Sequence, residues 1–203
     1  MKASVIKIDP VNPDKRLIAS AAKVIREGGL VVFPTETVYG IAANLLDDSA
    51  VARLHRVKAR PAGKPFTVHI SDKSMIKDMN CPIPETAEKL MNRFWPGPVT
   101  IILASGSGAK IGFRMPANKI ALELIRSSGV PIVAPSANLS GVNPPVTARQ
   151  ALMDLADKVD MVIDGGRTDV GVESTVIDVT TDPPAILRVG AISEEELLKA
   201  ING

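Results

Sequence analysis

The sequence predicts an α/β fold, with a twisted mixed sheet of parallel and antiparallel strands flanked by helices in a single domain. Two features of the chain support this fold class. Apolar runs typical of buried strands alternate with amphipathic helical stretches early in the chain, while the last third is richer in strands. No internal repeat or linker divides the 203 residues, a length that suits one domain, so we assign residues 1–203 to one unit.

Helix and strand signals place the elements of the first half. The Asn-Pro-Asp sequence at residues 12–14 predicts a helix start with Pro13 at the first helical position, and Gly28 ends that helix. The apolar residues 30–33 predict a short buried strand, which ends at Pro34. Further along, we predict helices at residues 48–57 and 85–94 and a strand at residues 66–70.

The predicted elements of the second half are mostly strands. Helices are expected at residues 118–128 and from the capping Thr147 to Ala156. Ser193 and Glu196 form a capping box for the last helix. We predict strands at residues 99–103, 111–115, 130–134, 161–163, 175–179 and 185–188.

The composition excludes several classes of protein. Hydrophobic residues make up 45% and charged residues 23%, which is ordinary for a folded chain and excludes wholesale disorder. No apolar run approaches the roughly 18 residues that span a bilayer, and charges come too early for a signal peptide. One cysteine and two histidines argue against a disulfide framework and a structural zinc site. We therefore expect a cytoplasmic protein with no membrane partner.

The charge and aromatic content weigh against some nucleic-acid binders. A net charge of +2 is not that of a polycation, and proteins that stack bases carry more aromatic residues than the 3% found here. The chain also lacks a P-loop, a dinucleotide-binding glycine fingerprint and a nucleophile elbow. A nucleotide site would therefore have to be built by another route.

Four polar segments carry residues that could bind a ligand. Residues 33–40 place short hydroxyl side chains beside a proline turn. Residues 56–65 hold four cations in a loop stiffened by proline, which suits a polyphosphate. Residues 134–141 follow a buried strand and offer serine and asparagine to a phosphate or nucleoside. Residues 164–178 combine glycines with a Glu-Ser-Thr sequence and a strand.

Each segment also has a purely structural interpretation. A capped turn explains the first segment, and the helix dipole favours cations at a helix C-terminus, which explains the second. An ordinary strand-to-loop turn explains the third segment, and a plain glycine turn explains the fourth. Arg114 and Arg188 end predicted strands, although most arginines are simply solvated. His69 lies inside an apolar strand, where a histidine is more often a satisfied core residue than a catalyst.

Seven motifs occur in order along the chain: Pro-Thr-Glu-Thr-Val-Tyr-Gly at 34–40, Lys-x-Arg-Pro at 58–61, Trp-Pro-Gly-Pro-Val-Thr at 95–100, Arg-Met-Pro at 114–116, Ser-x-Asn-x-Ser-Gly at 136–141, Gly-Val-Glu-Ser-Thr-Val-Ile-Asp at 171–178 and Arg-x-Gly at 188–190. Together they resemble the YrdC/TsaC family of threonylcarbamoyl-AMP synthases. The resemblance spans almost the whole chain, and its most specific part is Lys-x-Arg combined with Ser-x-Asn.

The resemblance implies a fold and a reaction. The family fold is a twisted mixed sheet around a concave, basic cavity. The implied reaction joins ATP, L-threonine and bicarbonate into threonylcarbamoyl-AMP and pyrophosphate, so the enzyme would be a nucleotidyltransferase. The product feeds the threonylcarbamoyladenosine modification of tRNA, which makes a downstream tRNA-modifying complex an expected partner.

The resemblance also assigns roles to residues. Lys58 and Arg60 would be catalytic, since from a solvated loop they would hold the ATP phosphates and stabilise charge on the departing pyrophosphate. Arg114 would clamp the threonine carboxylate through both arms of its guanidinium. The further ATP-binding residues would be Ser136, Asn138 and Arg188, and the further threonine-binding residues Thr35, His69, Ala134 and Ser174.

Cofactors and alternatives complete the expectations. Mg²⁺ would accompany ATP through phosphate oxygens and water, because the sequence shows no carboxylate cage and no dedicated metal ligands. No bound organic cofactor is expected.

One alternative is an RNA-binding module that holds tRNA or double-stranded RNA through Lys and Arg contacts. The other is a paralogue that binds a nucleotide without making this product. Longer relatives carry a further domain whose linker can cover the site, so we expect residues 58–65 to close it here.

Overall fold

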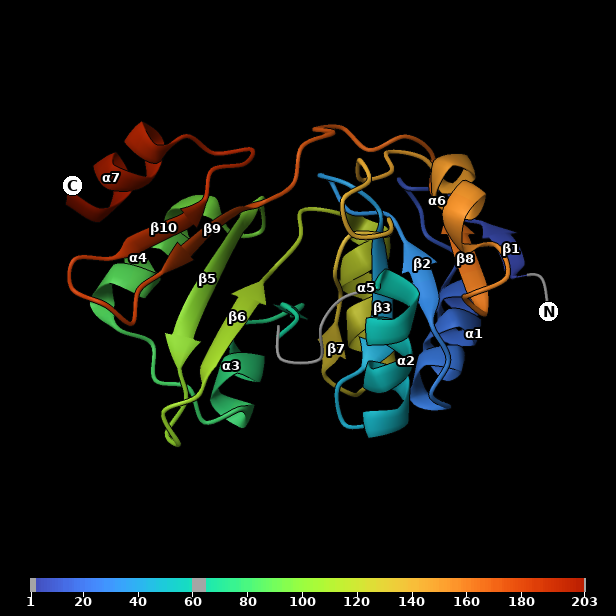
Figure 1. Cartoon of the computed structure of the whole chain (residues 1–203), viewed down its shortest axis with the longest axis horizontal. Helices are drawn as coiled ribbons and strands as arrows, with labels where there is room; N and C mark the ends of the chain where they lie inside the picture. The colour runs from blue at the N-terminus through green and yellow to red at the C-terminus, as the bar shows by residue number, and fades with distance from the viewer. Residues whose placement is uncertain (1–2, 60–64, 203) are drawn as a thin grey trace.

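A ten-stranded sheet runs through the part of the chain that the computed structural model describes, residues 3–59 and 65–202 (Figure 1). The strands lie in the order β1-β8-β2-β3-β7-β4-β6-β5-β9-β10. Their bounds are β1 Ser4–Lys7, β2 Val31–Phe33, β3 Gly40–Asn44, β4 Val68–His69, β5 Val99–Ala104, β6 Lys110–Arg114, β7 Ile132–Val133, β8 Met161–Asp164, β9 Thr175–Asp178 and β10 Ala185–Arg188.

Helices cover the sheet in two groups, one on each side of the middle of Figure 1. The strands β1, β2, β3, β7 and β8 lie with α1, α2, α5 and α6, while β5, β6, β9 and β10 lie with α3, α4 and α7. The helix bounds are α1 Lys15–Arg26, α2 Asp48–Lys58, α3 Ser74–Asp78, α4 Glu85–Phe94, α5 Lys119–Ser128, α6 Ala148–Leu155 and α7 Glu194–Asn202.

The sheet is mixed, as predicted. Parallel pairs join β1 to β8, β8 to β2, β4 to β6 and β5 to β9. Antiparallel pairs join β2 to β3, β3 to β7, β7 to β4, β6 to β5 and β9 to β10. The segment between β8 and β9 crosses from one group of elements to the other along the top of Figure 1. That crossing brings motif residues of both groups to the middle of the sheet.

The first helix begins two residues later than the sequence suggested. Asp14 is its N-cap, and the carboxylate accepts hydrogen bonds from the backbone of Arg16 (2.7 Å) and Leu17 (3.3 Å). Pro13 therefore lies outside the helix, because the aspartate following it is the better cap. The apolar face of α1 packs on α5, where Ile18 and Leu124 are fully buried in the same core cluster.

Most of the other predicted elements are confirmed within a few residues. β4 and β7 are two-residue strands, shorter than expected, and β1, β3 and α3 had not been predicted. Trp95 follows α4 and is buried, and its indole N–H donates to the carbonyl of Val99 (2.7 Å), where β5 begins. In the described part of the chain, no helix is long and apolar enough to cross a membrane.

Candidate functional site

A cavity of about 430 Å³ opens in the middle of the sheet, at the ends of strands from both groups. Its charged lining comprises three cations and two carboxylates, so the expected basic character rests on a small excess of positive groups. The lining residues are Lys58, Pro65, Phe66, Thr67, Thr100, Ile102, Lys110, Gly112, Pro135, Ser136, Glu173, Val176, Asp178, Leu187 and Arg188.

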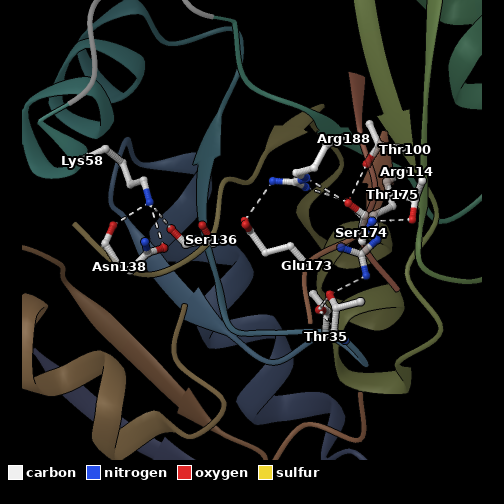
Figure 2. A network of polar contacts seen from close by, with 12 residues as sticks. Thr35, Lys58, Thr100, Arg114, Ser136, Asn138, Glu173, Ser174, Thr175 and Arg188 are labelled. Atoms are coloured by element: carbon white, nitrogen blue, oxygen red, sulfur yellow. Dashed lines mark hydrogen bonds and ion pairs between the residues drawn. The ribbon is translucent and has the colours of Figure 1, made fainter. Parts of the chain in front are cut away.

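Lys58 lies at one wall of this cavity, at the last position of α2. Its side chain is buried, and Nζ donates to the carbonyls of Ser136 (2.6 Å) and Asn138 (2.5 Å) and to Asn138 Oδ1 (3.2 Å). The expectation that Lys58 occupies a solvated loop is therefore wrong, because α2 continues to it and ends at Ala59 in the left-handed region (φ 48°). Lys58 joins α2 to the segment that follows β7, as Figure 2 shows.

Ser136 and Asn138 lie in that segment but differ in their surroundings. Ser136 lines the cavity. Asn138 is buried, and its Nδ2 donates to the carbonyls of Leu139 (2.9 Å) and Val142 (2.6 Å) while its Oδ1 accepts from Lys58. Asn138 thus shapes the loop that carries Ser136. Arg60, the second predicted catalytic residue, lies outside the described residues.

Arg188 reaches the cavity from the end of β10. Its Nη1 lies 3.1 Å from Glu173 Oε1, its Nε donates to the carbonyl of Ser174 (3.0 Å), and its Nη2 donates to Ser174 Oγ (3.2 Å). Ser174 Oγ in turn lies 2.9 Å from Thr100 Oγ1. In the view of Figure 2, Glu173 and Arg188 lie between the Lys58 group and the group around Ser174. Three contacts therefore fix the guanidinium of Arg188 while half of the side chain stays exposed.

The cavity lining also carries an ion pair between β6 and β9, the two strands that flank β5. Lys110 Nζ lies 2.8 Å from Asp178 Oδ2, and Asp178 Oδ1 accepts from the backbone (2.9 Å) and hydroxyl (2.6 Å) of Thr180. Burial raises the pKa of Asp178, but the hydrogen bonds from Lys110 and Thr180 outweigh it and leave that pKa below its usual value. Among the described residues, no group of three or more His, Cys, Asp or Glu side chains could hold a metal ion.

Arg114 and Glu36 form a buried ion pair next to the open cavity. Both side chains are more than nine-tenths buried, and Arg114 Nη2 lies 2.9 Å from Glu36 Oε1. The same Nη2 donates to Thr37 Oγ1 (2.7 Å). The contact with Glu36 is close enough for an ion pair but is not aligned as a hydrogen bond, so within the described chain Arg114 Nε and both Glu36 oxygens have no hydrogen-bond partner.

The hydroxyl groups of Thr37 and Thr35 extend the hydrogen-bond network from Arg114 to the carbonyl of Val38. Thr35 Oγ1 donates its single proton to the carbonyl of Val38 (2.7 Å), so in the 2.9 Å contact between the two hydroxyls it is Thr37 that donates to Thr35. Thr35 Oγ1 also accepts from the backbone N–H groups of Thr37 (3.2 Å) and Val38 (3.3 Å). The Thr35 hydroxyl is fully used within its own turn, so a ligand would meet Thr35 through its backbone.

His69 pairs with Arg114 in the parallel ladder between β4 and β6. The imidazole is buried, and this burial, together with the charge of Arg114, lowers the pKa of His69 to about 3. The ring is therefore neutral at neutral pH, and its Nδ1 has no hydrogen-bond partner within the described chain. Ala134 lies at the end of β7, buried, and its N–H donates to the carbonyl of the cavity residue Thr67 (3.0 Å).

The predicted site residues therefore fall into two adjoining places. Lys58, Ser136 and Arg188 line the cavity. The predicted threonine-binding residues Thr35, His69, Arg114, Ala134 and Ser174 are buried, and Ser174 contacts the cavity residues Thr100 and Arg188. Sequence reasoning missed the roles of Glu36, Thr37 and Glu173, although they stood inside quoted motifs, and it had no signal for Lys110.

A family model decides where this chain belongs. The model of the Sua5/YciO/YrdC family, which carries the description "telomere recombination", matches residues 23–190. The chain belongs to the Sua5/YciO/YrdC family. Family members of known structure share the fold: Pyrococcus abyssi Sua5 in complex with L-threonine superposes with a TM-score of 0.92 at 45% identity, covering 97% of this chain and 60% of that one.

Two relatives of this family differ in how much of their own length the chain covers. The threonylcarbamoyl-AMP synthase of Pyrococcus abyssi is 48% identical over 193 residues, and the match covers 91% of this chain and 57% of that protein. Escherichia coli YciO superposes with a TM-score of 0.86 at 30% identity, covering 96% of this chain and 99% of YciO. The chain thus spans little more than half of the Pyrococcus synthase but nearly all of YciO.

Proposed function

We propose that this chain synthesises L-threonylcarbamoyl-AMP from ATP, L-threonine and bicarbonate, with release of pyrophosphate. The observation that carries the proposal is an open cavity lined by three cations together with a buried Arg114–Glu36 pair whose charges suit an amino acid. The names of the relatives support it, since the synthase of Pyrococcus abyssi is 48% identical and a related Sua5 structure holds L-threonine.

The proposed chemistry asks the protein to position reactants rather than to form a covalent intermediate. The deprotonated threonine amine forms an N–C bond to the carbon of bicarbonate (or CO2), giving a carbamate with loss of water. A carbamate oxygen then attacks the α-phosphorus of ATP, and the bond to pyrophosphate breaks. Lys58 and Arg188 face the space where the phosphates would lie, and fixed cations stabilise the charge that develops on the leaving group. Arg114, with a buried Nε still to be paired, would bind the threonine carboxylate.

The cavity also fits the expected Mg²⁺ bound together with ATP. Its two carboxylates, Glu173 and Asp178, already pair with Arg188 and Lys110, so phosphate oxygens and water would supply most of the ligands. When bound, Mg²⁺ would neutralise the polyphosphate. The residues of the chain would then orient the nucleotide and keep water from the labile carbamate.

The product would be used outside this protein. A threonylcarbamoyl adenylate is an activated acyl donor, and we propose that a tRNA-modifying complex takes the threonylcarbamoyl group to adenosine. Direct contact with tRNA or double-stranded RNA is not needed for the synthase step. RNA binding that is independent of ATP and threonine and falls steeply with salt would instead favour the alternative of an RNA-binding module.

A second candidate follows from the likeness to YciO, which covers almost the whole of that protein. In this case the chain would bind a nucleotide but would not make the threonylcarbamoyl product.

One experiment separates the candidates. Purified protein is given ATP, Mg²⁺ and bicarbonate, with and without L-threonine, and pyrophosphate and the adenylate are measured. Release that needs both threonine and bicarbonate, with the adenylate identified by mass spectrometry, supports the synthase. ATP binding without release supports the second candidate. A folded protein that does not bind ATP contradicts both.

A further inference from the structure

The buried cluster beside the cavity has a hydrogen-bonding capacity that the described chain does not satisfy. Both oxygens of Glu36, Nε of Arg114 and Nδ1 of His69 are buried there without a hydrogen-bond partner among the described residues. Three of these atoms belong to the ion pair between Arg114, at the end of β6, and Glu36, in the turn after β2. The fourth belongs to the residue that pairs with Arg114 in the neighbouring strand.

Such a cluster is costly for a protein to keep. Each unsatisfied buried polar group keeps the full cost of its removal from water, and a buried ion pair is favourable only when further hydrogen bonds complete it. The ion-pair contact with Arg114 Nη2 at 2.9 Å leaves both carboxylate oxygens of Glu36 without a hydrogen bond among the described residues. His69 adds no positive charge, because burial lowers its pKa to about 3. The cluster is therefore built for a ligand that supplies the missing partners.

The unmet groups define the chemistry of that ligand. Arg114 Nε is a donor that lacks an acceptor, while the Glu36 oxygens are acceptors that lack donors, and hydrogen bonds between oppositely charged groups are the strongest ones available to both. The two residues are in contact, so the ligand must present a positive and a negative group close to each other. The α-ammonium and α-carboxylate of an amino acid meet this requirement. A phosphate offers acceptor oxygens alone, and would satisfy Arg114 while leaving Glu36 unpaired.

We propose that Glu36 binds the α-amino group of the amino-acid substrate and thereby selects for it. This inference rests on the proposed function and deepens its threonine site. Arg114 takes the carboxylate, and Glu36 takes the amine, which is the atom that must be carboxylated. Glu36 then does two things at once, since it orients Arg114 through the ion pair and places the nitrogen, which must lose a proton before it can attack CO2.

The first test uses the wild-type protein, so it does not depend on a variant that folds. Calorimetry compares L-threonine with (R)-3-hydroxybutyrate, which keeps the carboxylate and hydroxyl but lacks the amine. We expect threonine to bind about 10-fold to 100-fold more tightly, the value of a charge-assisted hydrogen bond plus the cost of leaving Glu36 unpaired. Equal affinities would overturn the inference.

The second test uses Glu36→Gln, which keeps the size of the side chain and removes its charge. Threonine should bind about 10-fold or more weakly, while 3-hydroxybutyrate should bind as before or better, so that the preference for the amine largely disappears. A role through Arg114 alone would weaken both ligands equally, since both carry the carboxylate, and this result would also overturn the inference. Glu85→Gln, at an exposed glutamate, is the matched control.

The outcome for the proposed function can be separated from the outcome for Glu36. If the wild-type protein binds no L-threonine at all, the proposed function fails and this inference fails with it. If threonine binds and reacts but the amine adds nothing to affinity, the synthase stands and the role of Glu36 alone is wrong.

Discussion

At the scale of single residues, Lys58 has a structural role and, in the proposed function, a second role in nucleotide binding. Three acceptors of its Nζ belong to Ser136 and Asn138, so the ammonium places a positive charge at the cavity wall and fixes the loop that carries Ser136. A phosphate that binds Lys58 must share or replace one of these contacts. In the proposed function, Lys58 would couple the position of the nucleotide to the position of the loop after β7.

Lys58→Ala should impair both stability and nucleotide binding. Two carbonyl groups lose a charged donor, so we expect the free energy of unfolding to fall by about 2 kcal/mol and ATP to bind at least about 10-fold more weakly. Urea denaturation and calorimetry measure the two effects. Lys23→Ala, at an exposed lysine, is the control. A variant with unchanged stability would mean that the Nζ contacts contribute nothing to the fold.

His69 should make stability depend on pH. Its pKa is about 3 in the folded chain, against 6.5 for the free group, so the unfolded state binds more protons between these values. The stability that comes from keeping His69 neutral in the folded chain is fully present above pH 6.5, and it is lost as the pH falls toward 3. At about 1.4 kcal/mol per pH unit, wild type should lose about 2 kcal/mol more than His69→Gln between pH 7.5 and pH 5 in urea denaturation. Identical losses would contradict a buried neutral imidazole.

The predictability of single residues depended on whether their signal was local. The capping box of Ser193 and Glu196 could be anticipated because the two partners lie three positions apart, and the helix start near Asp14 was predicted to within two residues. The contact between Glu36 and Arg114 joins residues 78 positions apart in the sequence. Nothing in the neighbourhood of Glu36 indicates that its partner is an arginine, so its role required the structure.

At the scale of elements, the turn after β2 and the segment between β8 and β9 hold each other. The backbone N–H groups of Val170 and Gly171 donate to the carbonyls of Glu36 and Thr37 (both 2.9 Å). Tyr39 Oη donates to the carbonyl of Gly166 (2.6 Å) and accepts from the N–H of Gly165 (3.3 Å). The segment that leads to Glu173 and Ser174 is thus attached to the turn that carries Glu36.

Tyr39→Phe should loosen this attachment. Loss of the two hydroxyl contacts leaves backbone groups of Gly165 and Gly166 unpaired, so we expect a loss of about 1–2 kcal/mol in the free energy of unfolding. Amide hydrogen exchange should become faster at Val170 and Gly171, whereas amides of α1 should be unaffected. Unchanged exchange at Val170 and Gly171 would show that their own backbone bonds are enough. Burial raises the pKa of Tyr39 to about 12, so the hydroxyl stays protonated at neutral pH.

Element prediction failed where composition and environment disagree. β3 has the sequence Gly-Ile-Ala-Ala-Asn, and glycine and alanine are depleted in strands, yet all five residues are buried between β2 and β7. Small side chains are needed there, because a Cβ on Gly40 would lie 3.3 Å from the ring of Phe33 and 3.4 Å from the carbonyl of Pro135. Tertiary packing thus overrides local propensity beside the site.

At the scale of the whole molecule, the mixed sheet was predictable but its strand order was not. Ser4 of β1 pairs with Met161 of β8, and Val99 of β5 pairs with Thr175 of β9. Such long-range pairings leave no trace in the hydrophobic pattern of either strand, so periodicity predicts that strands exist but not which strands are neighbours. The cavity depends on that order, because its walls come from strands distant in sequence.

Ligands that bind across the two groups of elements should stabilise the whole chain. At a concentration 100-fold above the dissociation constant, ATP should add about 2.7 kcal/mol to the free energy of unfolding, which corresponds to a rise of about 5–10 °C in Tm. Adding L-threonine should raise Tm further. Differential scanning calorimetry of wild type and Lys58→Ala measures this, with the smaller rise expected for the variant. No rise with saturating ATP would contradict a nucleotide site in the cavity.

The chain has a built-in optical probe at the edge of this site. Trp95 is its single tryptophan, and its indole is held by the carbonyl of Val99, next to the cavity residue Thr100. All tryptophan fluorescence therefore comes from one buried place at the start of β5. A change in emission when ATP or threonine is added reports on the strand that carries Thr100, and so binding can be followed without attaching a label.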